Sequence, residues 1–127
     1  ESGDSLRVPQ RSARPVTMDG PKVYLEAVRA MMKTLKSSAD AAEIDLNELD
    51  LYIPHQANQR IINAIRQRMK IERARMYSNI ENNGNTSSST IPICIDELLS
   101  SRESGEIWGL TAFGGGFTYG AALVRTL

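Results

Sequence analysis

The stretch that decides how this chain folds is Pro54-His55-Gln56-Ala57-Asn58-Gln59-Arg60. The apolar run Leu49 to Ile53 leads into it and predicts a buried strand, which Pro54 ends. Apolar residues at helical spacing lead away from it and predict a helix. The stretch holds the only histidine of the chain, and open α/β sheets place their sites at the carboxyl ends of strands. His55 is therefore a candidate for chemistry, although the residue alone leaves a structural or surface role open.

The helix expected after His55 combines an apolar face with a basic side. The apolar face comprises Asn58, Ile61, Ile62, Ile65 and Met69, and the exposed side carries Arg60, Arg66, Arg68 and Lys70. Such a basic side is often only a solvated surface. It can equally be a functional surface. The helix pattern alone does not decide between these two explanations.

The chain before this stretch predicts a leading loop and one long helix. Residues 1–18 are rich in Pro, Ser and Arg, so we expect a loop there, and its length hints at a cut within a larger domain. Asp19 followed by Pro21 is a helix start signal and predicts a helix over about 20–37, whose Met and Leu stripe belongs to the core. Residues 45–48 resemble a capping box that opens a short turn.

Beyond the central helix, the sequence predicts a polar loop between two ordered elements. Residues 76–80 are a candidate for a second short strand, and residues 81–89 are rich in Asn, Gly and Ser, which is typical of a loop. An apolar helical pattern begins at Ile91, so the loop is expected to be ordered as well. Cys94 lies on the apolar face of that helix and is interpreted as a buried core residue rather than a nucleophile.

A tight hairpin is predicted at the end of the chain. Apolar runs over 106–113 and 117–124 flank Gly114-Gly115-Gly116. Glycines allow a tight turn and let the backbone approach another group closely, because no Cβ stands in the way. They join two strands rather than a strand and a helix, so they do not match a dinucleotide-binding fingerprint.

The composition argues against several classes of function. Fifteen basic residues balance fifteen acidic ones, so bulk attraction to nucleic acid or to an anionic membrane is not indicated. No apolar run approaches the roughly 18 residues that span a bilayer. Cys94 is the only cysteine, which excludes an internal disulfide. With only one histidine in addition, the chain has too few zinc ligands of the usual kinds, which argues against a zinc site. A lone cysteine fits a reducing compartment, so we expect a cytoplasmic protein without a metal.

Three features stand in a fixed order: His55 in its Pro-His-Gln-Ala-Asn stretch, Asn85 in Gly84-Asn85-Thr86-Ser87, and the hairpin Ala112–Gly120. In this order they resemble the C-terminal half of β-ketoacyl-acyl-carrier-protein synthase III, a family of the thiolase-like superfamily. The resemblance extends from about Met18 to the C-terminus. It implies one domain over 19–127 with an α/β fold, in which a mixed, mostly parallel sheet with helices ends in an antiparallel hairpin.

The resemblance implies a decarboxylating Claisen condensation that initiates fatty acid biosynthesis. An acyl group from acyl-CoA is loaded onto a cysteine, and malonyl-acyl carrier protein loses carbon dioxide to form the attacking carbanion. By position, His55 and Asn85 would bind the malonyl thioester carbonyl. The Gly115 N–H would be an oxyanion-hole donor for the acyl-enzyme, and Phe113 would form the active-site wall beside the malonyl carboxylate.

The resemblance also implies binding residues and partners. Ala57 and Asn58 would line the pantetheine or CoA tunnel, and Arg60 and Arg68 would dock the acidic acyl carrier protein. Substrates would arrive on CoA and on the phosphopantetheine of the carrier protein, so no resident cofactor is expected. The full-length enzyme would be a homodimer.

The chain departs from the family pattern in one respect that matters for activity. The catalytic cysteine belongs to the N-terminal half, and Cys94 does not lie in a nucleophile turn. We therefore expect a fragment that is inactive alone and that exposes the apolar face on which the missing half packs. Ala112 disfavours thiolase chemistry, and Asn85 disfavours the chain-elongating synthases. A secondary-metabolite acyltransferase of the same superfamily and a non-catalytic carrier-protein-binding module remain as alternatives.

Overall fold

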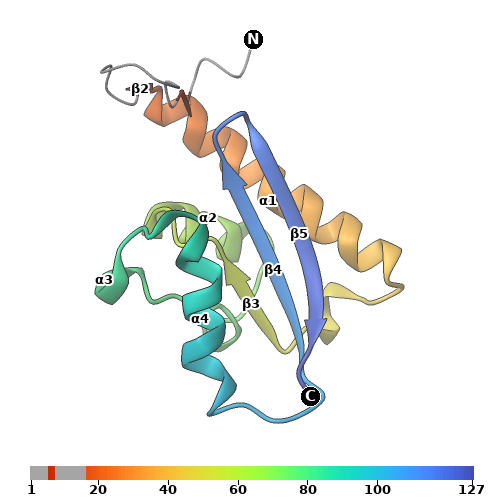
Figure 1. The fold of residues 1–127 in the computed structure, drawn as a ribbon. Helices are drawn as coiled ribbons and strands as arrows, with labels where there is room; N and C mark the ends of the chain where they lie inside the picture. The colour runs from red at the N-terminus through yellow and green to blue at the C-terminus, as the bar shows by residue number, and fades with distance from the viewer. Residues whose placement is uncertain (1–5, 8–16) are drawn as a thin grey trace.

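The computed structural model describes residues 6–7 and 17–127 (Figure 1). The helices are α1 (Gly20–Ala41), α2 (Gln59–Arg68), α3 (Ile80–Asn83) and α4 (Thr90–Leu99), with 3₁₀ turns η2 (Leu46–Glu48), η3 (Arg73–Arg75) and η4 (Ser87–Ser89). The strands are β1 (Leu6–Arg7), β2 (Thr17–Met18), β3 (Leu51–Pro54), β4 (Ile107–Gly114) and β5 (Thr118–Arg125). None of the helices within residues 17–127 is long and apolar enough to cross a membrane.

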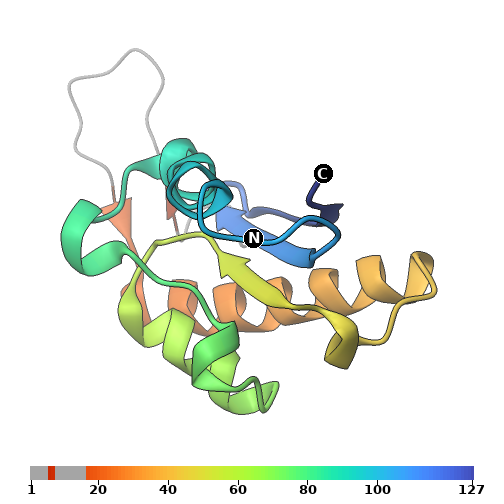
Figure 2. The same ribbon diagram turned by 90° about the horizontal axis from the view of Figure 1, so that it is seen from below.

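The main sheet has the order β3-β4-β5, with β3 parallel and β5 antiparallel to the central strand β4. Helices cover both faces: α1 and α2 lie on one side of the sheet and α4 lies on the other (Figure 2). The predicted α/β fold with a C-terminal antiparallel hairpin is confirmed. Parallel pairing does not dominate in the described residues, because the antiparallel pair β4–β5 is longer than the parallel pair β3–β4.

Strand β3 is buried on both faces because the two helical layers enclose it. Tyr52 packs into the cluster formed with α1 and α2. Leu51 and Ile53 point the opposite way and pack with Cys94 and Trp108 in the cluster beneath α4. Alternate side chains of a strand point to opposite faces, so a fully apolar run is what this position requires.

The start of α1 and the turn η2 agree with their local signals. The Asp19 side chain accepts a hydrogen bond from the Lys22 N–H (3.2 Å), and Pro21 lies in the first turn. Asp45 and Glu48 form the predicted capping box around η2. Helix α1 continues to residue 41, beyond the expected end near 37, because Ala39 is buried and Ser38 hydrogen-bonds the Ala121 carbonyl oxygen of β5.

Three sequence predictions about strands need correction. Residues 76–80 do not form a strand: Met76 makes only an isolated bridge to Tyr52, and the chain then turns into α3. The strand predicted to begin at Leu49 begins at Leu51, and Pro54 ends it as expected. The leading segment 1–18, predicted as a loop, contains the short antiparallel pair β1–β2. Such short pairings carry no sequence period of their own, because too few residues take part to show an alternation.

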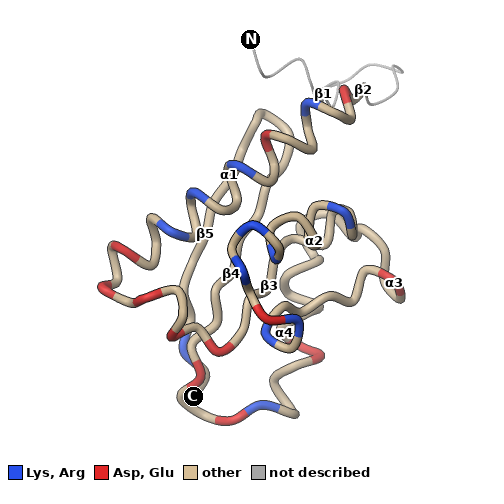
Figure 3. The backbone as a smooth tube through the Cα atoms, turned by 180° about the vertical axis from the view of Figure 1, so that it is seen from behind, with Lys and Arg blue, Asp and Glu red and all other residues tan. Residues whose placement is uncertain are grey.

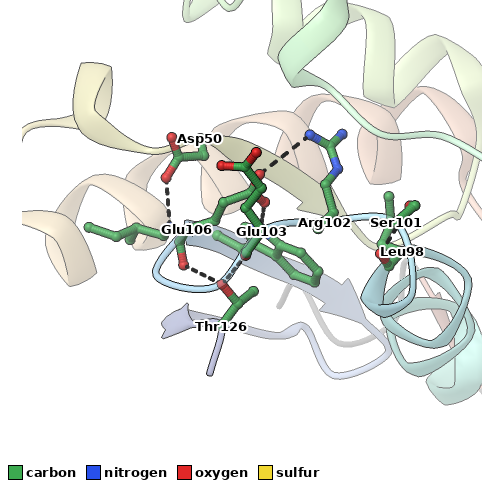
Figure 4. Close-up of polar contacts among 9 residues, drawn as sticks. Asp50, Leu98, Ser101, Arg102, Glu103, Glu106 and Thr126 are labelled. Carbon is green, nitrogen blue, oxygen red and sulfur yellow. Dashed lines mark hydrogen bonds and ion pairs between the residues drawn. The ribbon is translucent and has the colours of Figure 1, made fainter.

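The loop between α4 and β4 is closed by polar contacts at the edge of the sheet opposite the carboxyl end of β4 (Figure 4). Glu106 accepts a hydrogen bond from the Trp108 indole N–H (2.7 Å) and pairs with Arg102 (3.8 Å). The Asp50 carboxylate accepts a hydrogen bond from the Ile107 N–H (2.7 Å), and the Thr126 hydroxyl donates to the Glu103 carbonyl oxygen (2.7 Å). These contacts fix where β4 begins relative to β3 and β5.

We predict that Gly109→Ala destabilises the fold. An added Cβ would lie 2.9 Å from Leu49 Cδ1 and 3.0 Å from Leu35 Cδ1. Both leucines are fully buried and have little room to move, so overpacking should lower the free energy of unfolding by about 1 to 3 kcal/mol. Urea unfolding measures this change. Gly120→Ala is the matched control, since its Cβ would meet no atom within 4 Å, and equal losses in both variants would contradict the prediction.

Candidate active site

The candidate site lies where β3 and β4 end, at one edge of the sheet (Figure 1). His55 follows β3 directly, and its N–H donates to the Thr111 carbonyl oxygen of β4 (2.7 Å). Two adjoining pockets of about 450 and about 1000 Å³ open here and share His55, Phe113 and Gly114 in their linings. The position agrees with the general location of sites in α/β sheets.

Seven of the eight residues proposed from the sequence line the larger pocket. They are His55, Ala57, Asn58, Arg60, Asn85, Phe113 and Gly115. Arg68 is not among the lining residues. One wall comes from α1, through Tyr24, Ala27 and Met31, so the stripe predicted as core on that helix also borders the pocket.

His55 presents one ring nitrogen to the pocket. Its Nδ1 lies 2.5 Å from the Thr90 hydroxyl oxygen, so Nε2 is the ring nitrogen left for a ligand. Burial lowers the pKa of the imidazole from its ordinary value of 6.5. The ring is therefore neutral at neutral pH and can donate a single N–H without carrying charge.

Asn85 has a fixed amide orientation although its side chain is exposed. Its Oδ1 accepts a hydrogen bond from the Ser87 N–H (2.9 Å) within the loop before η4. This contact uses the acceptor end of the amide, so the NH₂ group is the end available to a ligand in the larger pocket. The site thus offers two neutral N–H donors from two different loops.

The glycine turn shapes the third side of the site. Phe113 is buried and packs against Phe117, with ring centroids 4.8 Å apart. Gly116 has φ +138°, and a Cβ there would lie 2.6 Å from the Thr118 hydroxyl oxygen, so only glycine fits. That hydroxyl donates to the Gly115 carbonyl oxygen (2.8 Å) and holds the turn. The predicted tight hairpin is confirmed.

Asn58 has a different local role from the one expected. It is the N-cap of α2, and its Oδ1 accepts a hydrogen bond from the Arg60 N–H (2.8 Å). The prediction that Asn58 belongs to the apolar face of that helix is wrong, because the residue is exposed and precedes the first turn. A cap must lie at the helix end, where its side chain reaches free backbone N–H groups.

Arg60 and Arg68 are both exposed on α2, a helix with three arginines and no acidic residue (Figure 3). They do not form one continuous exposed stripe, because Ala64 between them is buried. The Arg60 guanidinium lies over the Tyr24 ring, 5.7 Å from its centroid, at the rim of the larger pocket. This stacking supports the placement of Arg60 at the site. Among the described residues, no such contact supports a placement of Arg68 there.

Sequence reasoning missed Gln56, which holds the loop after β3. The residue is fully buried, its Nε2 donates to the Pro54 carbonyl oxygen (2.6 Å), and its Oε1 accepts from the Asn79 N–H (3.1 Å). Asn79 also donates to Glu97 of α4 (2.8 Å). No signal in the sequence indicates this link, because the partners are distant along the chain. Thr90, the partner of His55, was missed for the same reason.

Cys94 is a core residue, as predicted. It is fully buried on the face of α4 that packs on the sheet, and it lines neither pocket. Burial, together with the negative charge of Glu97, raises the pKa of its thiol to about 11, so the reactive thiolate is not formed at neutral pH. Within residues 17–127, no three His, Cys, Asp or Glu side chains gather closely enough to hold a metal ion.

Comparisons with known proteins identify the family of this chain. Residues 39–126 match the family described as "3-Oxoacyl-[acyl-carrier-protein (ACP)] synthase III C terminal". Together with a thiolase-like α/β fold, this match shows that the chain belongs to the synthase III family. The chain corresponds to the C-terminal part of these enzymes.

Relatives and solved structures give the same result. The β-ketoacyl-[acyl-carrier-protein] synthase III of Synechococcus elongatus is 41% identical over 94% of this chain and 36% of its own length. The crystal structures of the synthase III enzymes from Aquifex aeolicus and Pseudomonas aeruginosa match with TM-scores of 0.90 and 0.91 at 34% and 32% identity. The matches cover 97% and 98% of this chain but 40% of each of those chains. The chain thus spans well under half of the relatives it matches.

We predict that Gln56→Leu destabilises the protein by about 2 to 4 kcal/mol, because the buried Pro54 carbonyl and Asn79 N–H both lose their partner. Chemical unfolding measures the loss. Gln67→Leu is the control: Gln67 lies exposed on α2, so the change there should be small. A loss no larger than that of the control would contradict the role given to Gln56.

A second prediction concerns pH. His55 has a lower pKa in the folded state than the ordinary 6.5, so the unfolded chain binds more protons between the two values. Above pH 6.5 the His55 ring is mostly neutral in both states, so it does not oppose folding. As the pH falls from 6.5 through the lower pKa of the folded state, protons bind preferentially to the unfolded chain and the free energy of unfolding decreases. We expect the free energy of unfolding to decrease from about pH 7 to about pH 5, and to decrease less in His55→Gln. Unfolding curves across this range test it, and identical slopes would contradict it.

Proposed function

We propose that this region binds and decarboxylates malonyl-acyl carrier protein within a synthase III-type condensing enzyme that initiates fatty acid biosynthesis. The single observation that carries the proposal is the pair of neutral donors, His55 and Asn85, in the pocket that Phe113 also lines. The contacts with Thr90 and with the Ser87 N–H occupy the other polar end of each side chain, so His55 and Asn85 would each present an N–H to a substrate. We place both donors at the thioester oxygen.

The chemistry follows from where charge develops. When the bond between the malonyl carboxylate and the α-carbon breaks, carbon dioxide leaves and its bonding electrons move to the α-carbon and the thioester oxygen. Two N–H donors aimed at that oxygen stabilise the growing negative charge without any proton transfer. A neutral His55 suits this task, and burial favours the neutral ring.

The hairpin would serve both halves of the reaction. The buried ring of Phe113 beside the malonyl carboxylate would disfavour the charged group and favour its loss as neutral carbon dioxide. The Gly115 N–H would donate a hydrogen bond to the oxygen of the acyl-enzyme carbonyl as negative charge develops there, and the lack of a Cβ lets the thioester approach the backbone.

The larger pocket is suited to a long thioester arm. Its volume is about 1000 Å³, and Ala57 and Asn58, which lie between His55 and Arg60 in the sequence, line it together with those two residues. We place the phosphopantetheine arm of the carrier protein, or of CoA, along these residues. Arg60 at the rim would meet the acidic carrier protein, and Arg68 would add only distant attraction from the same helix.

The acyl-accepting cysteine must come from outside these 127 residues, because Cys94 is buried and lines neither pocket. Large apolar side chains are exposed at Leu99 on α4 and at Val124 on β5, which fits packing against further chain. We therefore propose that this region works within a longer enzyme, a homodimer in the cytoplasm that takes its acyl group from acyl-CoA, and that it is inactive alone.

We predict that His55→Ala and Asn85→Ala each lower malonyl decarboxylation by about 100- to 1000-fold in the complete enzyme, since each removes one donor to the developing oxyanion. Release of carbon dioxide from malonyl-acyl carrier protein is the measurement. Lys36→Ala, an exposed substitution on α1 away from both pockets, is the control.

Unchanged decarboxylation in both donor variants would overturn the mechanism. Binding of the carrier protein with no decarboxylation in the unmodified protein would instead support the alternative of a non-catalytic binding module. Condensation onto acyl groups of secondary metabolism, at the expense of those of fatty acid synthesis, would support the other alternative from the same superfamily.

A further inference from the structure

Thr90 is the one residue that contacts the His55 ring through a hydrogen bond among the described residues. It is the first residue of α4, is 2% exposed, and its hydroxyl oxygen lies 2.5 Å from His55 Nδ1. The two residues are 35 positions apart, so only the fold brings them together. This contact uses the ring nitrogen that does not serve the pocket.

The direction of this hydrogen bond follows from the partners available. If His55 Nδ1 carried the proton, the Thr90 hydroxyl would accept it, and its own O–H would need another acceptor. Within residues 17–127, the Thr90 hydroxyl makes no hydrogen bond other than the one to His55. A buried hydroxyl without an acceptor is costly, whereas donation to Nδ1 satisfies both groups.

We propose that Thr90 is a positioning residue: its hydroxyl donates to His55 Nδ1 and thereby holds the proton of the neutral ring on Nε2, facing the pocket. The opposite tautomer would present a lone pair to the thioester oxygen and repel it. The consequence for catalysis rests on the proposed function, whereas the hydrogen bond itself does not.

Both partners are held by the surrounding structure. His55 is fixed through its backbone N–H on Thr111. Helix α4 is fixed on the sheet by the buried side chains of Cys94 and Leu98, and by Glu97, which accepts hydrogen bonds from Tyr77, Asn79 and Asn83. These hydrogen bonds lower the pKa of Glu97, and the bond from Tyr77 has the largest effect. The carboxylate therefore stays ionised as an acceptor at neutral pH.

The chain offers a direct test because His55 is its only histidine. In a sample labelled with ¹⁵N-histidine, long-range proton–nitrogen NMR spectra above pH 7.5 report the protonation of each ring nitrogen without any activity assay. In a longer protein with further histidines, His55→Gln identifies the same signals by subtraction. Thr90→Val removes the hydroxyl and keeps the shape, and Thr90→Ser keeps the hydroxyl. Ser88→Ala removes a hydroxyl from the same pocket without touching His55.

The expected result is an Nε2–H ring whose Nδ1 resonance has the shift of a hydrogen-bond acceptor in the unmodified protein, in Thr90→Ser and in Ser88→Ala. In Thr90→Val this resonance should move toward that of a nitrogen without a donor. A proton on Nδ1 in the unmodified protein, or an unchanged Nδ1 resonance in a folded Thr90→Val, would overturn the proposal. Thermal unfolding establishes that each variant is folded.

Activity then separates this inference from the proposed function. We expect Thr90→Val to lower the kcat of decarboxylation by about 10- to 100-fold, with KM unchanged and Thr90→Ser near normal, as for loss of an orienting partner. A normal kcat in Thr90→Val, with His55→Ala inactive, would overturn the positioning role alone. A normal rate in His55→Ala would overturn the proposed function and leave the hydrogen bond standing.

Discussion

The parallel pairing of β3 with β4 is the constraint on which the rest of the structure depends. It ends both strands at the same edge of the sheet, and the His55 N–H continues the pairing onto the Thr111 carbonyl oxygen. The buried Thr111 hydroxyl in turn donates to the Met31 carbonyl oxygen (3.1 Å), which joins β4 to α1. The histidine, the glycine turn and the helical wall of the pocket therefore share one support.

Polar contacts around this support explain why the loop after β3 has one arrangement. Buried polar groups are costly unless they are paired, and a fully paired set favours a single conformation. Gln56 is paired at both ends of its amide, and Thr90 is paired with the His55 ring. Two connections, one from the Asn79 region and one from the start of α4, thus hold the loop beside a site whose two proposed donors, His55 and Asn85, are neutral.

Much of the fold could be predicted because its signals are local. The Asp19 cap, the capping box at Asp45 and the glycine hairpin each depend on residues within a few positions, and all three occur as expected. The prediction of a strand over residues 76–80 was wrong, because the isolated bridge between Met76 and Tyr52 leaves no periodic pattern in the sequence. The prediction that Asn58 lies on the apolar face of α2 was wrong, because apolar spacing does not distinguish the first turn of a helix from its cap.

The sequence by itself determined the long helix, the central strand and helix, the C-terminal hairpin and the family, together with the candidates His55 and Asn85. These follow from side-chain period, turn chemistry and motif order, which are written along the chain. Only the tertiary structure decided which ring nitrogen of His55 is free, that Gln56 supports its loop, and that α1 forms a wall of the pocket. Those facts depend on contacts between residues far apart in sequence, and such contacts exist only once the sheet and helices are packed.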